Sequence, residues 1–250
     1  MMAGDLVIVG GGLVGMTLGV AAAAAGLDVI VVDREDPTAQ LDRGFDGRAS
    51  AIAHGSKQVL AAIGVWPLVA ETGAIEHIRV TDGPSLMHLH FDHAQLGEEP
   101  LGWLVENRHM RAALAQRAAA LADRLTVVAP AGVVSVDRQG ARATVTLADG
   151  RVLRAPLVVA ADGRRSRLRD EAGIAVTEWG YGQTGLVCTV AHEYPHEGVA
   201  HERFLTPGPF AILPLAGNRS SIVWTERHED AARIQALDDL RYLEELRARF

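Results

Sequence analysis

The chain has 250 residues, a formal net charge of −7 at pH 7, 48% hydrophobic residues and 22% charged residues. This composition is ordinary for a globular protein, and the length allows one large domain or two smaller ones. No basic stretch offsets the negative charge, which argues against a nucleic-acid partner.

A single cysteine, Cys188, excludes an intramolecular disulfide and a cysteine-based metal site, and it fits a reducing cytoplasm. The alanine-rich N-terminus has no basic leading region, and Asp28 interrupts its apolar stretch. These features predict neither a signal peptide nor a membrane-spanning helix.

The N-terminal segment carries a dinucleotide-binding pattern. Residues Val7–Gly15 read as a buried strand, a glycine turn and a helix start, and Asp33 ends a second apolar strand. Gly10 allows a tight turn, Gly12 lets backbone approach a pyrophosphate, and Gly15 lets the helix pack closely on the sheet. The helix start offers N–H groups to phosphates, and Asp33 can accept a hydrogen bond from a ribose hydroxyl. The alternative is an ordinary βαβ turn without a ligand.

The middle of the chain alternates between helical and strand-like patterns. A helical pattern begins at Arg48, and a second helix is predicted from about Asn107 to Ala122. Short strands are predicted at 77–81, 87–91, 125–128, 132–137, 143–147 and 157–161. The last of these strands is wholly apolar, which predicts a central place in a sheet.

The C-terminal part has a different pattern. Alternating segments predict an antiparallel sheet with one covered face, at 184–191, 200–205, 210–215 and 220–225. Trp224 and Phe210 are expected in the core of this sheet rather than along a substrate cavity. Residues 230–250 predict a charged amphipathic helix whose spacing continues to Phe250 without a stop signal, which suggests a polypeptide cut from a longer protein.

Three further segments make a family recognisable. Residues Asp162–Arg169 have the form D-G-x-x-S-x-x-R after an apolar strand, Glu106–Arg108 precede a helix, and Glu202–Pro209 lead into Ile212–Leu215. With the N-terminal fingerprint and Arg48–Ala51, the chain resembles the single-component flavin aromatic hydroxylases, and within them the ubiquinone-biosynthesis hydroxylases. The fingerprint alone is shared widely, whereas its combination with the Asp-Gly segment is much more specific.

The resemblance implies an α/β fold, in which an FAD-binding Rossmann-like βαβ domain is interleaved with an antiparallel-sheet substrate domain. The FAD-binding domain would comprise residues 1–73 and 108–176, and the substrate domain residues 74–107 and 177–226. Residues 227–250 would begin a C-terminal helix.

The implied activity is that of an FAD-dependent monooxygenase. It would hydroxylate a phenolic ring, a prenylated ubiquinone precursor, with NAD(P)H as electron donor and dioxygen as co-substrate. The protein would be cytoplasmic, with peripheral contact to the inner membrane or to a biosynthetic complex. No catalytic residue is named, and the ring position, the choice of NADH or NADPH and the oligomeric state are left open.

Carried over by position, the cofactor-binding residues would be Gly10, Gly12, Gly15, Asp33, Arg48, Arg108, Asp162 and Gly163. The glycines of the fingerprint would face the FAD pyrophosphate, and Asp33 the adenosine ribose. Arg48 and Arg108 would lie along the cofactor, although they could equally be surface arginines paired with local acids. Asp162 would contact the ribityl or pyrophosphate region, and it could also cap the following helix.

Two alternatives stay open. The family's second acidic motif, G-D-x-x-H followed by P-x-x-G-x-G, does not occur before Phe250. The chain could therefore be a non-catalytic dinucleotide-binding fragment. It could also belong to another FAD-dependent oxidoreductase, a reductase or a halogenase, although the extra Trp-rich motif of halogenases is not found. His88, His90 and Asp92 share a strand face, which we interpret as a solvent-facing edge, and no metal is predicted.

Overall fold

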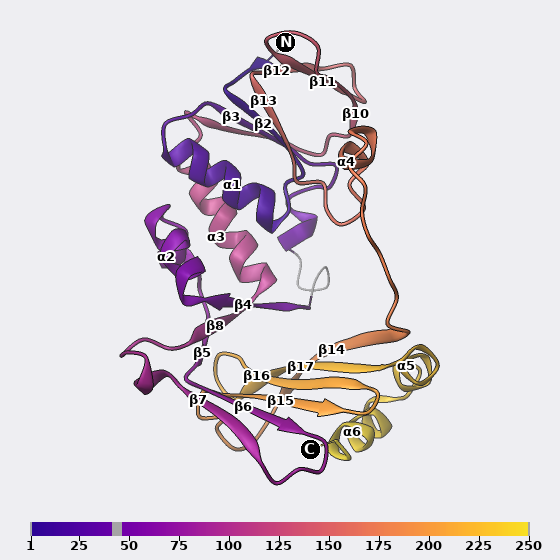
Figure 1. The fold of residues 1–250 in the computed structure, drawn as a ribbon. Helices are drawn as coiled ribbons and strands as arrows, with labels where there is room; N and C mark the ends of the chain where they lie inside the picture. Colours follow the sequence, from indigo (N-terminus) through magenta and orange to yellow (C-terminus); the bar gives the residue numbers. More distant parts are fainter. Residues whose placement is uncertain (1, 42–46, 250) are drawn as a thin grey trace. The chain divides into compact units, whose positions relative to one another are not determined.

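A computed structural model describes residues 2–41 and 47–249 (Figure 1). The chain divides into two compact units. The first comprises Met1–Asp46, Gln58–Ala70 and Asn107–Thr177, and the second Gly47–Lys57, Glu71–Glu106 and Glu178–Phe250. Both units are discontinuous in sequence, so each is closed by contacts between segments that lie far apart along the chain. The predicted helix end at Phe250 falls outside the described residues.

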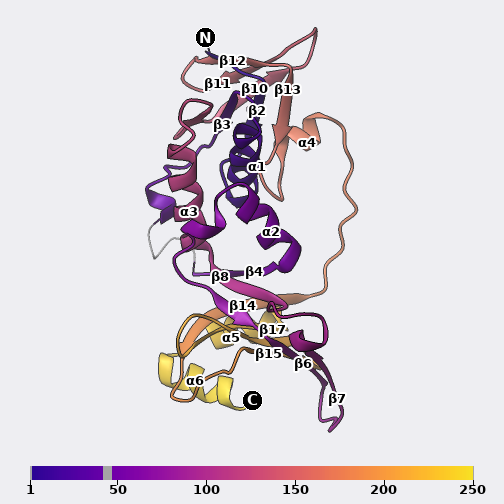
Figure 2. The same ribbon diagram turned by 90° about the vertical axis from the view of Figure 1, so that its left-hand side faces the viewer.

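The first unit is built on a parallel four-stranded sheet. Its order is β13 (Leu157–Ala160), β2 (Leu6–Val9), β3 (Val29–Val32), β9 (Leu125–Val128). Because β2 and β3 consist only of buried valine, isoleucine and leucine, the two strands form the middle of this sheet. The helices α1 (Leu13–Ala24) and α3 (Asn107–Ala119) lie side by side (Figures 1 and 2).

A second sheet of four short strands completes the first unit. Its order is β1 (Met2–Ala3), β12 (Val152–Ala155), β11 (Ala143–Leu147), β10 (Val133–Asp137). The buried residues Val145, Leu147 and Leu153 join one core with Val7 and Ile30 of the parallel sheet. The short helix α4 (Arg167–Glu171) follows the Asp-Gly segment. The strand β12 was not predicted, and it forms because β11 turns back at Gly150, which has φ +86°.

The second unit contains a six-stranded sheet. Its order is β14 (Gln183–Ala191), β17 (Arg219–Arg227), β16 (Gly208–Pro214), β15 (Val199–Leu205), β6 (His77–Asp82), β7 (His88–Asp92). Every pair is antiparallel except β15 and β6, which run parallel. The prediction that Trp224 and Phe210 lie in the core is confirmed, because both are fully buried.

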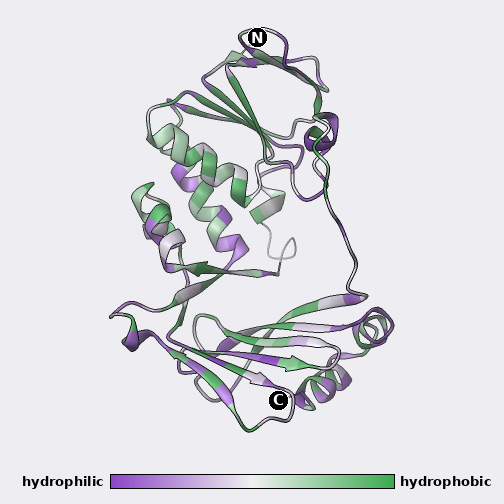
Figure 3. Ribbon diagram, in the orientation of Figure 1, coloured by the Kyte–Doolittle hydropathy of each residue, from purple (hydrophilic) through white to green (hydrophobic). Residues whose placement is uncertain are grey.

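Two helices pack on one face of this sheet, α5 (His228–Gln235) and α6 (Asp239–Arg247). Most residues of these two helices are hydrophilic (Figure 3), whereas Ile234 and Leu246 contribute to the core around Trp224. A separate three-stranded sheet has the order β4 (Ala49–Ala53), β8 (Gly102–Glu106), β5 (Gly73–Ile75), and the helix α2 (His54–Ala62) follows β4.

Three local predictions were wrong. The helical pattern from Arg48 is a strand over Ala49–Ala53, because β4 pairs along its length with β8, and the helix begins only at His54. The strand at 157–161 was predicted to be central, but β13 lies at an edge of its sheet, and Leu157 is 57% exposed. The C-terminal helix is two helices, because the Asp238 carboxylate accepts a hydrogen bond from Arg241 N at 3.0 Å and starts a new one.

The β4–β8 pairing also affects how the chain divides. Residues 47–57, which the sequence-based division places in the first domain, have their contacts mainly in the second unit. No helix among the described residues is both long and apolar enough to cross a membrane.

Candidate functional site

The glycine turn after β2 is held by close backbone contacts that a side chain would prevent. Gly10 has φ +110°, and a Cβ added there would lie 2.2 Å from the carbonyl oxygen of Ala161. A Cβ on Gly15 would lie 1.9 Å from the carbonyl oxygen of Gly10. These two glycines therefore fit the roles of tight turn and close packing that the fingerprint assigns to them.

Gly12 differs from the other two. It is the N-cap of α1, and a Cβ added there would meet nothing within 4 Å. No side chain caps this helix, and its first turn contains no acidic residue. Val14, in the same turn, is 76% exposed. The start of α1 is thus an open group of backbone N–H donors with partial positive charge, which suits a phosphate.

Asp33 closes one side of this turn. Its carboxylate accepts hydrogen bonds from the backbone N–H of Gly11 at 2.5 Å and of Glu35 at 2.7 Å. Each carboxylate oxygen can accept a further bond, so a ribose hydroxyl can bind without displacing either backbone donor.

Pairing of β13 with β2 brings the Asp-Gly segment to the same turn. Ala161 N donates to the carbonyl of Val9 at 2.7 Å, and the missing Cβ of Gly10 leaves room for the backbone of Asp162. The Asp162 carboxylate accepts from Ser166 Oγ at 2.5 Å and from Leu168 N at 3.4 Å. The N-cap of α4 is Ser166, whose Oγ accepts from Arg169 N at 3.0 Å, so Asp162 supports this cap through Ser166 and keeps acceptor positions for a ligand hydroxyl.

Gly163 and Arg169 shape the remainder of this segment. Gly163 has φ +92°, and a Cβ there would meet nothing within 4 Å. Arg169 donates to the carbonyl of Arg164 at 2.9 Å and so supports the turn from the following helix.

A cavity of about 350 Å³ opens beside the fingerprint turn in the first unit. Its polar residues include Asp33 and Arg111, and Gly11 and Gly12 contribute backbone. Most of the remaining lining is apolar: Leu13, Met16, Pro37, Leu41, Leu114, Leu125, Val127 and several alanines. A carboxylate for hydroxyls, an open helix start for phosphates and an apolar slot for a ring together fit the ADP half of FAD.

Sequence reasoning missed the far wall of this cavity. Arg111, Leu114, Ala115 and Ala118 lie on α3, far from the fingerprint in sequence. Their spacing places them on one face of a helix, and this was the only local signal that pointed to them.

The two predicted arginines are placed differently. Arg108 is half-buried in the first turn of α3, within the first unit. Arg48 is exposed and belongs to the second unit, immediately before β4. Neither is among the residues that line the 350 Å³ cavity.

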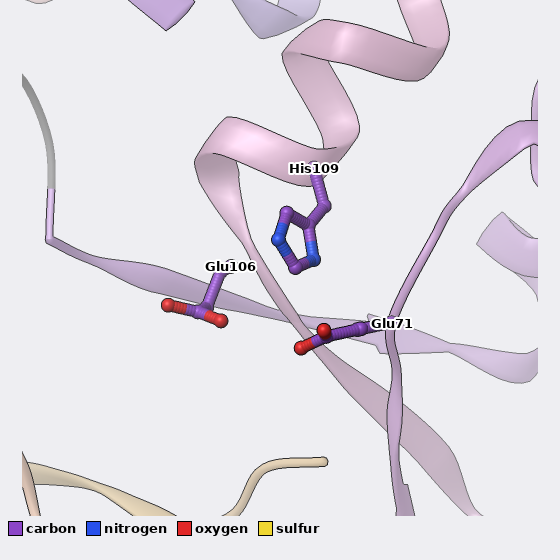
Figure 4. Close-up of side chains that lie close together, drawn as sticks. All are labelled: Glu71, Glu106 and His109. Carbon is purple, nitrogen blue, oxygen red and sulfur yellow. The ribbon is translucent and has the colours of Figure 1, made fainter. Parts of the chain in front are cut away.

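Two carboxylates of the second unit share one arginine. Figure 4 draws Glu71 and Glu106, which lies at the end of β8. Glu106 and Glu71 accept hydrogen bonds from Arg219 at 3.2 and 3.0 Å, respectively. Figure 4 also draws His109, which belongs to α3 of the other unit, so we assign no site to the three residues.

The predicted strand with His88, His90 and Asp92 is β7, at one edge of the six-stranded sheet. His90 lies opposite Arg79, and Asp92 lies opposite His77, on the paired strands β6 and β7. Among the described residues, His88, His90, Asp92 and His93 do not bring three ligand atoms close enough together to hold a metal.

Comparisons with known proteins agree with this geometry. Residues 4–250 match the family described as FAD binding domain. The chain is 48% identical over 98% of its length to ubiquinone hydroxylase UbiL of Rhodospirillum rubrum, of which it covers 57%. It is 32% identical over 98% of its length to the mouse mitochondrial ubiquinone biosynthesis monooxygenase COQ6, of which it covers 55%. The resemblance predicted from the motifs is confirmed, and the chain spans little more than half of these relatives.

The solved structures support the fold class. The crystal structure of PqsL, a probable FAD-dependent monooxygenase from Pseudomonas aeruginosa, matches with a TM-score of 0.79 at 22% identity. The match covers 94% of this chain and 63% of PqsL. The predicted α/β class, a Rossmann-like βαβ domain interleaved with a sheet-rich domain, is thereby confirmed. With its fingerprint turn, its Asp-Gly segment and a family match over residues 4–250, the chain belongs to the FAD-binding domain family.

Proposed function

We propose that this chain is the FAD-binding and substrate-covering part of a monooxygenase that hydroxylates a phenolic ring in ubiquinone biosynthesis. The observation that carries the proposal is the contact between two motifs. The fingerprint turn at Gly10 lies directly against Ala161 and Asp162, beside a cavity with the donors and apolar walls that an ADP moiety needs. The 48% identity to a ubiquinone hydroxylase supports the substrate class.

Each predicted residue has a role in this proposal. The N–H groups around Gly12 bind the pyrophosphate, Gly10 and Gly15 hold the turn that presents them, and Asp33 accepts from the adenosine ribose. Asp162 and Gly163 contact the ribityl or pyrophosphate region from the other side of the turn.

Arg48 and Arg108 complete the proposed set of cofactor-binding residues. Their guanidinium groups supply positive charge along the cofactor. FAD, when bound, supplies the redox chemistry, with NAD(P)H as electron donor and dioxygen as co-substrate. The protein's part is to orient the phenol and to keep water from the reacting atoms.

The two units are assigned different roles, because their secondary structure differs. We assign the cofactor to the first unit, because it contains the parallel sheet and the glycine turn. We assign cover of the substrate to the six-stranded sheet of the second unit.

Peripheral contact with a lipid surface belongs to the same proposal, because a prenylated phenol resides in a membrane. The hairpin of β6 and β7 supports it. Leu86 at its tip is 99% exposed, and Met87, Leu89 and Phe91 are exposed beside it. Co-sedimentation with liposomes is expected, and Leu86→Ser with Met87→Ser should reduce it. Failure to co-sediment both with and without anionic lipid would contradict this part of a cytoplasmic, membrane-peripheral assignment.

Flavin retention tests the cofactor site. The purified chain is incubated with FAD and desalted, and its visible absorption spectrum is recorded. We expect a flavin band in the native sequence and its loss in an Asp33→Ala, Asp162→Ala double variant with an unchanged circular dichroism spectrum. A retained band justifies measuring NADPH-driven dioxygen consumption with phenols. A folded chain without measurable FAD affinity in fluorescence titration would contradict the cofactor assignment for these residues.

A further inference from the structure

A second cavity, of about 570 Å³, lies in the second unit on the face of the six-stranded sheet that α5 and α6 cover further along the strands. Strand alternation places Val190, Ile212 and Ser220 on this face, together with the core residues Phe210 and Trp224. The volume is that of an ordinary small-molecule site. No proposed FAD-binding residue belongs to its lining.

The charge of the cavity is positive. Its lining contains Arg203 and three histidines, and none of the described lining residues is aspartate or glutamate. On the paired strand β6, Arg79 lies opposite His201. Burial, followed by the neighbouring charges of Arg79 and Arg203, lowers the pKa of His201. The positive field therefore comes from the arginines, while His201 stays neutral near pH 7.

One hydroxyl in the cavity has no partner. Thr81 Oγ1 is buried and makes no hydrogen bond, and the strand register places Thr81 directly opposite Arg203. Arg203 donates one N–H to the backbone carbonyl of Arg249, and a guanidinium has further donors for a ligand. A buried hydroxyl without a partner carries a desolvation cost that a ligand oxygen at this point would remove.

The other two histidines are already committed. His192 Nδ1 lies 2.6 Å from the carbonyl of Tyr194, and its Nε2 lies 3.0 Å from Ser220 Oγ. His196 Nε2 lies 2.8 Å from the carbonyl of Leu215, and its Nδ1 accepts from Gly198 N at 3.1 Å. Because both nitrogens of each ring are bonded, these side chains are walls of the cavity rather than metal ligands.

We propose that this cavity binds an amphipathic organic anion, with its carboxylate between Arg203 and Thr81 and its aliphatic body along Val190, Val199 and Ile212. Apolar walls from three strands and a single cationic end match a ligand of this shape. The proposal does not depend on FAD, since it concerns a separate cavity.

Decanoate tests the proposal by isothermal titration calorimetry and by histidine-ring NMR of the whole chain. We expect decanoate to shift the ring signals of His201 and to raise its pKa, because the carboxylate offsets the two arginines. Decanol, which has the same chain without the charge, should bind about tenfold more weakly or worse, as a charge-assisted hydrogen bond requires.

Matched variants distinguish the site from general hydrophobic binding. Arg203→Met and the nearly isosteric Thr81→Val should each weaken decanoate binding, the former by about tenfold. Arg241→Met, on the exposed surface of α6, should leave it unchanged. Equal affinity for decanoate and decanol, or undiminished binding in folded Arg203→Met and Thr81→Val proteins, would overturn the proposal. Flavin retention by the same variants separates this outcome from a failure of the cofactor site.

Discussion

At the residue scale, the three fingerprint glycines have different physical reasons for being glycine. Gly10 and Gly15 are surrounded by backbone atoms, whereas Gly12 faces open space. A sequence motif treats the three alike, yet the fold itself requires glycine only at Gly10 and Gly15. Gly12 is free of that constraint, so we predict that its small size serves a ligand that comes close to the backbone.

This difference predicts that alanine at Gly15 will affect stability, whereas alanine at Gly12 will affect FAD binding. Gly15→Ala should lower the free energy of unfolding by about 2 kcal/mol or more, because the new Cβ would lie 1.9 Å from a carbonyl oxygen. Gly12→Ala should change it by less than about 0.5 kcal/mol and still weaken FAD binding. Urea unfolding and FAD fluorescence titration measure the two quantities. A strongly destabilised Gly12→Ala protein would contradict the conclusion that the fold does not require glycine at this position.

Cys188 gives a prediction for pH. Burial raises the pKa of its thiol, although a hydrogen bond from Tyr242 lowers it in part. The thiolate is the reactive form, so iodoacetamide should alkylate the folded chain more slowly at pH 8 than the urea-unfolded chain.

The direction of the pKa shift also fixes its effect on stability. The folded state favours the neutral thiol, so the contribution of Cys188 to stability is present below the unfolded pKa of about 8.5 and is lost as the pH rises through the folded pKa.

The alkylation experiment needs a control for the effect of urea on iodoacetamide. N-acetylcysteine, alkylated in the same urea concentrations, provides it. Equal alkylation rates for folded and unfolded protein would show that the thiol is not shielded.

At the scale of elements, one carboxylate decides that the C-terminal segment forms two helices. The Asp238 side chain accepts from Arg241 N and starts α6 shortly after α5 has ended at Gln235. The periodicity of the apolar residues continues through this break, which is why the pattern predicted a single helix. The break turns α6 so that Leu246 reaches the core on the sheet.

Asp238→Ala removes this cap and should cost about 1 kcal/mol of unfolding free energy. Asp238→Ser retains an acceptor oxygen at the same position and should recover most of the loss. The midpoint of urea unfolding, followed by tryptophan fluorescence, measures both changes. If the alanine and serine variants unfold at the same concentration as the native chain, the cap contributes nothing to the stability of α6.

At the scale of the whole molecule, the two units are interleaved in sequence. The second unit joins residues 71–106 to residues 178–250, chiefly through the parallel pairing of β6 with β15. The exposed segment 174–181 contains no helix or strand and leads from the first unit into the second.

Interleaving predicts that a cut between the units will not separate the fragments. A specific protease site inserted between Trp179 and Gly180 should be cleaved completely, because both neighbouring aromatic residues, Trp179 and Tyr181, are exposed. The two fragments should nevertheless elute together in size-exclusion chromatography and separate only in urea. Elution of the C-terminal fragment alone under native conditions would contradict the β6–β15 pairing.

The sequence alone determined the features that depend on neighbouring residues. The fingerprint from Gly10 to Gly15, the acid at Asp33 and the Asp-Gly segment at Asp162 were recognisable, because each encodes its backbone geometry locally. The four alternating segments after Gly182 were also predicted, because strand periodicity is local and strong. The family resemblance rests on these same residues, and the comparisons confirm it.

Only the tertiary structure decided which remote segments meet. The edge position of β13, the parallel β6–β15 pair and the strand at Ala49–Ala53 all depend on pairing partners far away in the chain. The same holds for both cavities, whose walls come from elements that no local pattern connects, such as Arg111 beside the fingerprint turn. Local sequence sets the conformation of a segment, but the burial of apolar surface against distant partners selects its neighbours, and sites form where those neighbours meet.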